Sequence, residues 1–253
     1  MKIVSHDAWL SHARPRPHAL VRLFCFPYAG AGASIFTPWS NELPSTIEVY
    51  PVQLPGREDQ FMTPAFTSLS PLIQLLAEVL TAYIDVPYAL FGHSMGALIA
   101  FELARYFRQL HFPKPVRLFV SGAYAPQVPG RFEDTPLHQL SESKLIAKLR
   151  ALNGTPEAVL NSTEILHLLL PSLRADFEVC ETYRYSAQEP LDCPISAFGG
   201  LQDSQISYSD LAAWAEQTTS DFNLRILPGD HFFIQSAQAM LLQALYYDLA
   251  LSK

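Results

Sequence analysis

Residues 88–98 read YALFGHSMGAL, an apolar run that passes through Gly-x-Ser-x-Gly into a helical pattern. A nucleophile elbow has this sequence, because its serine lies on a strained turn between a strand and a helix. Gly92 and Gly96 let the backbone pass without a side-chain clash. The string alone is a weak signal, but its place between a strand and a helix strengthens it. We therefore predict that Ser94 is an exposed nucleophile rather than part of an ordinary tight turn.

Short apolar runs and longer helical patterns alternate on both sides of this segment. Strands are predicted at Leu20–Phe26, Ile47–Val52, Tyr88–Phe91, Val116–Ser121, Pro194–Phe198 and Phe222–Leu227. Helices are predicted near Leu69–Tyr83, Ala97–Arg108, Tyr208–Gln217 and Ile234–Leu249. Several strands are apolar at both odd and even positions, as expected for a sheet that is covered on both faces. The alternation predicts an α/β fold with a mostly parallel central sheet flanked by helices.

Residues 125–185 interrupt this alternation, because they contain helical stretches and no convincing strand. We expect Gly154, Pro156 and Pro171 to break these helices, and Thr155-Pro156-Glu157 to start one with a hydroxyl cap and a proline at the first helical position. The many leucines between 166 and 173 give more apolar surface than one solvent-facing helix pair needs. The segment is therefore either an ordinary pair of packed helices or an insertion that caps the sheet and carries an apolar pocket.

A serine hydroxyl needs a base within hydrogen-bond reach, and after a nucleophile elbow the chain order is serine, acid, histidine. The histidines of the chain are His6, His12, His18, His93, His111, His138, His167 and His231. His231 follows the last predicted strand in a loop that contains proline and glycine, so it can return over the sheet. We expect His231 to be the base and His93 to be a packing residue of the elbow.

The candidates for the acid that orients His231 are aspartates that precede it, namely Asp192, Asp203, Asp210, Asp221 and Asp230. Asp203 follows the strand Pro194–Phe198 through a predicted tight turn at Gly199-Gly200, at the carboxyl edge of the sheet where such sites assemble. Asp210 is expected to be a solvated acid in the first turn of a helix. Asp230 is adjacent to His231 in the sequence, but we see no reason why this adjacency would let its carboxylate reach the imidazole ring. We therefore expect Asp203 to be the third member of the triad.

An acyl-transfer site also needs donors for the oxyanion. One is expected to be the backbone N–H of Met95, directly after the nucleophile. The second is expected from the loop FPYAGAG, residues 26–32, because its small residues permit a close backbone approach. Within that loop we prefer the N–H of Ala29, with Tyr28 as the alternative.

Further motifs accompany these residues and make the chain similar to a known family over nearly its full length. They are FPYAGAG (26–32), QLPGR (53–57), FGHSMG (91–96), LPSLRADF (170–177) and PGDHFF (228–233). With them the chain resembles a type II thioesterase, the free-standing hydrolase that accompanies modular nonribosomal peptide and polyketide synthases. The family usually has histidine where Tyr28 stands and often glycine at Ala31, and neither difference removes a backbone donor.

The resemblance implies an α/β-hydrolase fold in a single domain, 1–253, with a mobile helical lid at 125–185. It implies hydrolysis of acyl thioesters on the phosphopantetheine arm of acyl or peptidyl carrier proteins, which clears stalled or wrongly primed groups. Ser94, Asp203 and His231 occupy the positions of the family's triad. This chemistry requires no metal or redox cofactor, and members of the family often act as monomers.

The composition narrows the class of protein further. With 49% hydrophobic and 16% charged residues, the 253-residue chain is not intrinsically disordered. The formal net charge of −7 lacks the excess of positive charge that is expected of a nucleic-acid-binding protein. Three scattered cysteines fit a reducing compartment. Because we find neither a signal peptide nor a run of about 18 apolar residues, we expect a cytoplasmic protein that does not bind membranes.

Carrier proteins are generally acidic, so a chain of charge −7 should repel them. Docking would then rest on apolar contacts and a local basic patch that includes Arg57 or Arg174, although either arginine could instead be the buried partner of a carboxylate. Two catalytic alternatives keep the same triad, namely a general carboxylesterase and an acyltransferase. A non-catalytic binding module is disfavoured, because a scaffold has no need of a histidine on the loop of His231.

Overall fold

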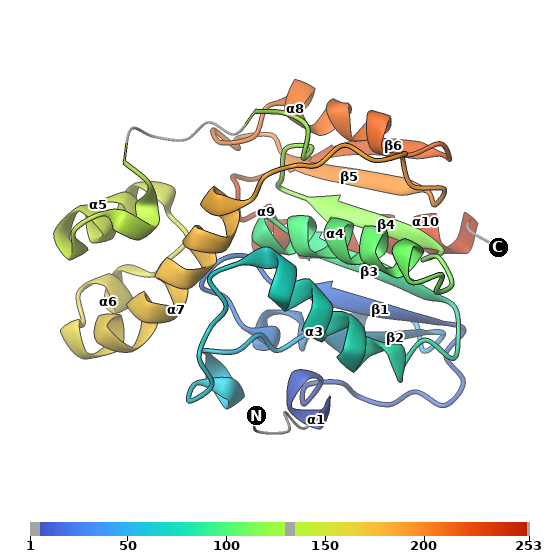
Figure 1. Ribbon diagram of the computed structural model, residues 1–253, viewed down its shortest axis with the longest axis horizontal. Helices are drawn as coiled ribbons and strands as arrows, with labels where there is room; N and C mark the ends of the chain where they lie inside the picture. Colours follow the sequence, from blue (N-terminus) through green and yellow to red (C-terminus); the bar gives the residue numbers. More distant parts are fainter. Residues whose placement is uncertain (1–5, 130–134, 252–253) are drawn as a thin grey trace.

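The computed structural model describes residues 6–129 and 135–251, and its centre is a six-stranded parallel sheet (Figure 1). The strand order is β2-β1-β3-β4-β5-β6, and all five pairs of neighbours are parallel. The strands are β1 (Val21–Phe26), β2 (Ile47–Pro51), β3 (Tyr88–His93), β4 (Arg117–Ser121), β5 (Ile195–Gly200) and β6 (Phe222–Leu227). Each predicted strand is confirmed to within two residues at either end.

Helices cover both faces of this sheet. The α-helices of the body are α1 (His6–Trp9), α2 (Trp39–Glu42), α3 (Leu69–Thr81), α4 (Met95–Gln109), α8 (Tyr208–Ala212), α9 (Phe233–Ser236) and α10 (Gln238–Leu251). Short 3-10 turns are η1 (Ala33–Phe36), η2 (Glu58–Gln60) and η4 (Ala213–Gln217). The helix predicted at 208–217 is therefore α8 continued by η4, and the one predicted at 234–249 is divided into α9 and α10.

Alternate side chains of each strand enter two different apolar cores, because successive residues of a strand point to opposite faces. Leu90 and Leu118 lie in the core beneath α3 and α4, whereas Phe91 and Phe119 lie in the core beneath α2 and α10. All four side chains are fully buried. This two-sided burial explains why several of the strands are apolar at both odd and even positions in the sequence.

The two glycines at the end of β5 do not form the predicted turn. Gly199 and Gly200 pair with Ile226 and Leu227 of β6 as ordinary strand residues. A Cβ on Gly199 would lie 2.3 Å from Leu211, and one on Gly200 would lie 2.3 Å from the carbonyl oxygen of Asp230. Close packing on the strand explains both glycines, and the turn that leads to Asp203 comes directly after it, where the N–H of Asp203 donates to the carbonyl oxygen of Gly200.

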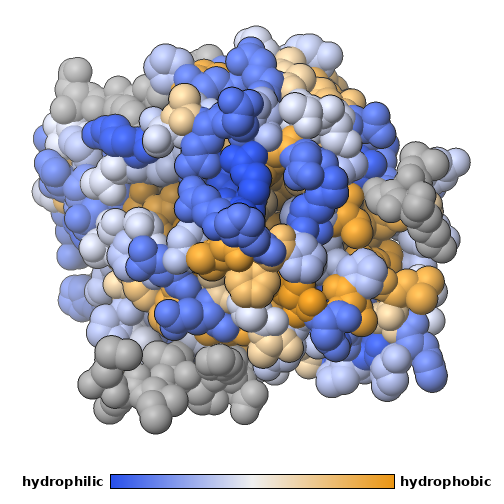
Figure 2. Space-filling view, turned by 45° about the vertical axis from the view of Figure 1, so that its right-hand side comes forward, coloured by the Kyte–Doolittle hydropathy of each residue, from blue (hydrophilic) through white to orange (hydrophobic). Residues whose placement is uncertain are grey.

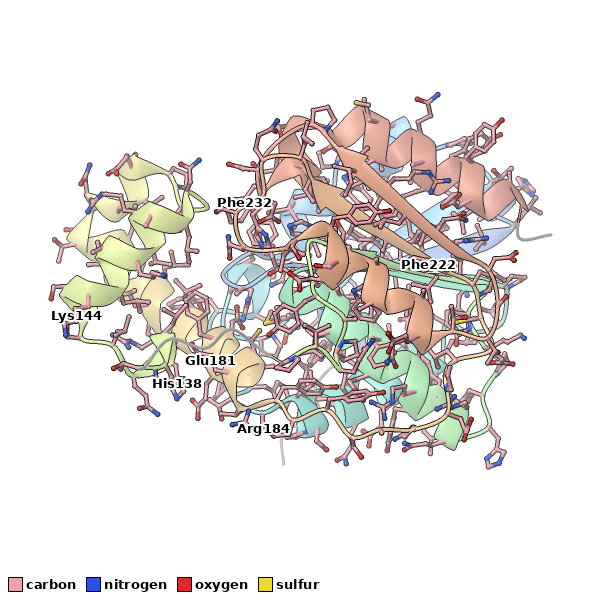
Figure 3. All side chains as sticks on the ribbon, turned by 90° about the horizontal axis from the view of Figure 1, so that it is seen from above. His138, Lys144, Glu181, Arg184, Phe222 and Phe232 are labelled. Atoms are coloured by element: carbon pink, nitrogen blue, oxygen red, sulfur yellow. The ribbon has the colours of Figure 1, made fainter. Side chains whose placement is uncertain are left out.

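The segment between β4 and β5 is helical and stands beside the body of the molecule (Figures 1 and 3). It contains η3 (Leu137–Gln139), α5 (Glu142–Leu152), α6 (Glu157–Leu160) and α7 (Thr163–Thr182). Its leucines form a small core of their own, in Leu145, Leu149, Leu160, Leu166, Leu170 and Leu173. We propose that this segment is the lid of a single domain; residues 130–134 of the range 125–185 lie outside the described residues.

Two local predictions for this segment were wrong. Pro171 lies inside α7 and does not end it, because the flanking turns are held by buried side chains such as Leu170 and Leu173. The helix after Thr155 begins one residue later than predicted, at Glu157, with Pro156 as its N-cap. The N-terminal end of α7 is the one with a hydroxyl cap, since Ser162 Oγ accepts a hydrogen bond from the N–H of Ile165.

The C-terminal end of α7 is fastened to η3. In Figure 3, His138 and Glu181 lie next to each other where α7 meets the body. The Glu181 carboxylate accepts hydrogen bonds from the backbone N–H groups of Leu137 and His138 and lies 2.5 Å from His138 Nδ1.

On the face shown in Figure 2, hydrophilic side chains cover most of the surface and leave small apolar patches between them. Among the residues that the structure describes, no helix is long and apolar enough to cross a membrane.

Candidate active site

Ser94 stands at the turn between β3 and α4, with backbone angles φ 52° and ψ −116°. Non-glycine residues rarely adopt such angles, and strain of this kind gathers at functional sites. The turn is possible because both flanking glycines lie against backbone. A Cβ on Gly92 would lie 1.9 Å from the carbonyl oxygen of Gly96, and one on Gly96 would lie 2.1 Å from that of Phe26.

His231 and Asp203 meet at the carboxyl edge of the sheet, on the loops after β6 and β5. His231 Nδ1 lies 2.8 Å from Asp203 Oδ2, and both side chains are buried. Asp203 Oδ1 accepts hydrogen bonds from the backbone N–H groups of Gln205 and Ile206. Because an ionised carboxylate can only accept, Nδ1 of His231 carries a proton and donates it to Asp203. In the neutral imidazole, Nε2 then has a lone pair for a substrate or nucleophile.

The electrostatics of Asp203 favour its ionised form. Burial alone would raise the pKa of this carboxyl. The hydrogen bond and charge of His231, together with the two backbone donors, outweigh burial and hold the pKa of Asp203 below its ordinary value. The group therefore remains an anion at neutral pH and can stabilise an imidazolium at His231.

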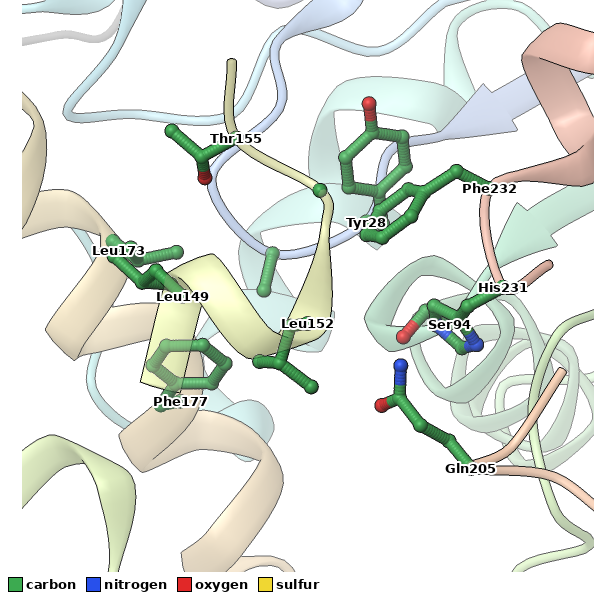
Figure 4. Close-up of a pocket in the computed structure, with 12 residues that line it drawn as sticks. Tyr28, Ser94, Leu149, Leu152, Thr155, Leu173, Phe177, Gln205, His231 and Phe232 are labelled. Carbon is green, nitrogen blue, oxygen red and sulfur yellow. The ribbon is translucent and has the colours of Figure 1, made fainter. Parts of the chain in front are cut away.

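Ser94 and His231 line two adjoining cavities, although no hydrogen bond joins their side chains in this structure. Such bonds are often long in proteins without a bound substrate. The smaller cavity, about 80 Å³, lies between the elbow and α5; Figure 4 shows Leu152 and Phe177 on one side of it and Ser94, His231 and Gln205 on the other. The larger cavity, about 240 Å³, has an apolar lining that includes Met95, Leu98, Phe177, Ile206 and Trp214.

Both backbone donors that the sequence suggests are at this site. Met95 is the first residue of α4, where N–H groups have no partner within the helix. Ala29 lines both cavities, and its N–H has no acceptor among the described residues. The N–H of Ala31 donates to the carbonyl oxygen of Tyr28, and Gly30 has φ 81°. These are the features of a type II turn with Ala29 at its first central position.

The remaining aspartates named from the sequence lie elsewhere. Asp192 pairs with Lys114 at the surface. Asp210 is buried rather than solvated, because it forms a capping box with Ser207 at the start of α8. Asp230 accepts from the N–H of Phe232 and from Asn153, not from His231. Asp221 is exposed before β6.

Of the two arginines considered for docking, Arg57 is not a surface cation, whereas Arg174 is half-buried. Arg57 is 6% exposed and pairs with Asp176. Arg174 donates to the backbone carbonyl of His138 within the lid. Within residues 6–129 and 135–251, no group of three His, Cys, Asp or Glu side chains is arranged to hold a metal ion. Several residues that line the cavities, such as Gln205 and Leu152, carried no signal in the sequence.

His93 is fully buried behind the elbow, as the sequence indicated, and it holds the loop of the base. Its Nε2 lies 2.9 Å from the carbonyl oxygen of His231, and its Nδ1 lies 2.9 Å from Ser121 Oγ. A carbonyl can only accept, so Nε2–H donates and Nδ1 accepts from the hydroxyl. Burial, reinforced by the nearby ring of His231, lowers the pKa of His93 to about 3. The ring is neutral at physiological pH.

This buried imidazole predicts a loss of stability in mild acid. The pKa of an unfolded histidine is about 6.5, so the unfolded chain binds a proton that the folded chain does not. The contribution of the neutral His93 to the free energy of unfolding is therefore fully present above pH 6.5, and it is lost as the pH drops toward 3. Between pH 7.5 and 5, His93 should account for about 2 kcal/mol of lost unfolding free energy.

Urea unfolding of wild type and His93→Gln at the two pH values measures this contribution. Only the change with pH is compared, because the substitution also alters packing. We expect the variant to lose less stability than wild type over this range. Equal losses in the two proteins would contradict a neutral, buried His93.

A parallel sheet with a nucleophile elbow, a histidine after the last strand and an acid after β5 defines an α/β-hydrolase with the site of a serine hydrolase. The comparison with protein families gives the more specific assignment. A thioesterase domain matches residues 21–246, and the chain belongs to this thioesterase family.

Similar proteins agree with this assignment. The gramicidin S biosynthesis protein GrsT of Aneurinibacillus migulanus is 46% identical over 97% of this chain and 95% of its own length. RedJ, a thioesterase from the prodiginine pathway of Streptomyces coelicolor, has 37% identity and a TM-score of 0.85, covering 96% of this chain and 94% of RedJ. BorB, a type II thioesterase from the borrelidin cluster, has 35% identity and a TM-score of 0.85, covering 97% and 99%. The chain is a thioester hydrolase.

Proposed function

We propose that this protein hydrolyses acyl thioesters on the phosphopantetheine arm of acyl or peptidyl carrier proteins, with Ser94 as nucleophile, His231 as base and Asp203 as the acid that orients it. The observation that carries the proposal is the junction of two cavities at Ser94 and His231 in a member of the thioesterase family. Structures described as type II thioesterases, namely BorB and YbtT of the yersiniabactin NRPS/PKS pathway, supply the class of substrate.

The reaction needs two transfers at the same serine. Ser94 Oγ attacks the thioester carbonyl while His231 Nε2 takes the hydroxyl proton. The tetrahedral oxyanion accepts hydrogen bonds from the N–H groups of Met95 and Ala29. The C–S bond then breaks, and the thiol leaves with the proton from His231. Water attacks the acyl-enzyme by the same route, so the products are a free acid and the free thiol of the arm.

The leaving group of a thioester needs less help from a general acid than that of an amide does. A thiol with a pKa near 8.5 leaves more readily than an amine, so protonation by His231 is less demanding. We assign the acyl chain to the larger, apolar cavity and the arm to the smaller opening beside Leu152 and Thr155. One chain supplies every group of this site, and we propose that the protein acts as a monomer.

Intact-mass measurement of acetyl-, propionyl- and longer acyl-carrier proteins tests the proposal directly. Incubation with wild type should remove the acyl mass and leave the carrier with its free arm, whereas Ser94→Ala should leave the acyl group in place. The same series ranks the chain lengths that the larger cavity accepts.

Small oxygen esters serve as the comparison substrates. Their turnover without any loss of acyl groups from carriers would make the protein a general carboxylesterase. Transfer of the acyl mass to an added alcohol or amine in place of water would make it an acyltransferase. Either result would overturn carrier editing as the function.

A further inference from the structure

Two motifs far apart in the sequence meet in one buried ion pair next to the proposed oxyanion donor. Arg57, which ends the QLPGR motif, donates from Nη1 and Nη2 to the two carboxylate oxygens of Asp176 at 2.5 and 2.7 Å. Asp176 belongs to the LPSLRADF motif on α7 and is 3% exposed. Both groups are therefore paired at two points and removed from solvent.

The carboxylate of Asp176 also binds the turn that presents Ala29. Its Oδ2 accepts a hydrogen bond of 2.7 Å from the N–H of Gly30. Arg57 Nη1 in turn donates to the carbonyl oxygen of Ala31. The pair thus holds the backbone on both sides of Gly30, whose φ of 81° the type II turn requires.

The same helix covers the cavities. Leu173 and Phe177 lie within one turn of Asp176 on α7, and both line the smaller cavity beside Ser94. A Cβ on Gly30 would lie 2.8 Å from Leu173. The helix therefore contacts the turn through an apolar side chain and through a charged one.

We propose that Asp176 is a positioning residue for the proposed thioester hydrolysis: from the lid helix, and supported by Arg57, it fixes the turn that aims the N–H of Ala29 at the oxyanion. This inference rests on one part of the proposed function, the attack of Ser94 on an acyl thioester. It does not depend on a carrier protein being the substrate. A purely structural ion pair would stabilise the fold without affecting the transition state.

Three variants separate the two roles. Asp176→Leu leaves the buried charge of Arg57 without its carboxylate partner and should lower both Tm and activity. The double variant Arg57→Met/Asp176→Leu replaces the pair with apolar side chains, which often restores stability. We expect its Tm to recover while kcat/KM stays about 10²-fold below wild type, near the loss caused by removing one oxyanion donor. Asp176→Asn keeps an amide oxygen that can accept from the N–H of Gly30, so it should lower kcat/KM by less than the double variant does.

Asp248→Asn is the matched control. Asp248 is fully buried and bound by both terminal nitrogens of Arg225 at 2.6 Å, but it lies on α10 beside Ser196, near the amino end of β5. The variant should lose stability and keep kcat/KM.

All variants are assayed on a soluble N-acetylcysteamine thioester, so the result does not depend on whether carriers are substrates. The second readout is inhibition by an acyl trifluoromethyl ketone, which forms a tetrahedral oxyanion on serine. Its Ki should rise in Asp176→Asn and in the double variant by the factor that kcat/KM falls. Recovery of kcat/KM together with Tm in the double variant, or an unchanged Ki in that variant, would overturn the proposal.

Discussion

Replacing Ser94 with alanine is expected to lower kcat for acyl thioesters by about 10⁶-fold, because the other triad members cannot act without the nucleophile. The residual rate would come from binding and the oxyanion donors alone. The fold should persist, since the left-handed turn is held by the close contacts of Gly92 and Gly96 rather than by the hydroxyl. Steady-state hydrolysis of an acyl-carrier and of a small thioester measures the loss.

A fluorophosphonate provides an independent test of the same serine. Wild type should gain one covalent adduct, and Ser94→Ala should gain none at an unchanged Tm. A label of the same stoichiometry in the variant would place the nucleophile elsewhere.

Replacing Asp203 with asparagine is expected to lower kcat by up to about 10⁴-fold without loss of the fold. The amide can present its NH₂ group to His231 Nδ1, and this favours the tautomer whose proton is on Nε2. Nε2 is then a donor instead of the acceptor that Ser94 needs. The backbone donors of Gln205 and Ile206 can still bind the amide oxygen, so the loop should stay in place.

Asp230→Asn is the control for this substitution. Asp230 is adjacent to His231 in the sequence but accepts from the N–H of Phe232. Its replacement should leave kcat nearly unchanged. The pH profile and Tm of both variants are measured with kcat, and a large loss in Asp230→Asn with none in Asp203→Asn would transfer the role to Asp230.

The burial of Arg57 changes how a carrier protein can approach. The chain has a formal charge of −7, and the arginine of QLPGR is occupied by Asp176 inside the molecule. Any docking of an acidic carrier therefore has to use other cations or apolar contacts. Ile165 and Leu168 are exposed apolar side chains on α7, the helix that also carries Leu173 of the smaller cavity.

The sequence predicted the sheet well and selected the three residues of the proposed triad, because both inferences depend on local patterns. Buried parallel strands are continuous apolar runs, and the elbow needs two glycines at fixed spacing around Ser94. The chain order of the fold then leaves His231 as the histidine that follows the last strand. These features can be read without knowing which segments touch.

The remaining features depend on contacts between distant segments, so no local pattern indicated them. Gly199 and Gly200 look like a turn until the neighbouring Leu211 and Asp230 are placed. Pro171 ordinarily ends a helix, but packing of the lid core keeps α7 continuous. Arg57 and Asp176 are 119 residues apart, and neither residue alone indicates its partner.

The hydrogen bond from His93 to the carbonyl of His231 joins residues 138 positions apart. Such a contact cannot form until both segments have been synthesised and the long loop between them has closed. During synthesis the elbow leaves the ribosome long before β6 and the histidine loop exist. A nascent chain therefore carries its nucleophile without a base, and it can neither hydrolyse a thioester nor be acylated rapidly until the last strand joins the sheet.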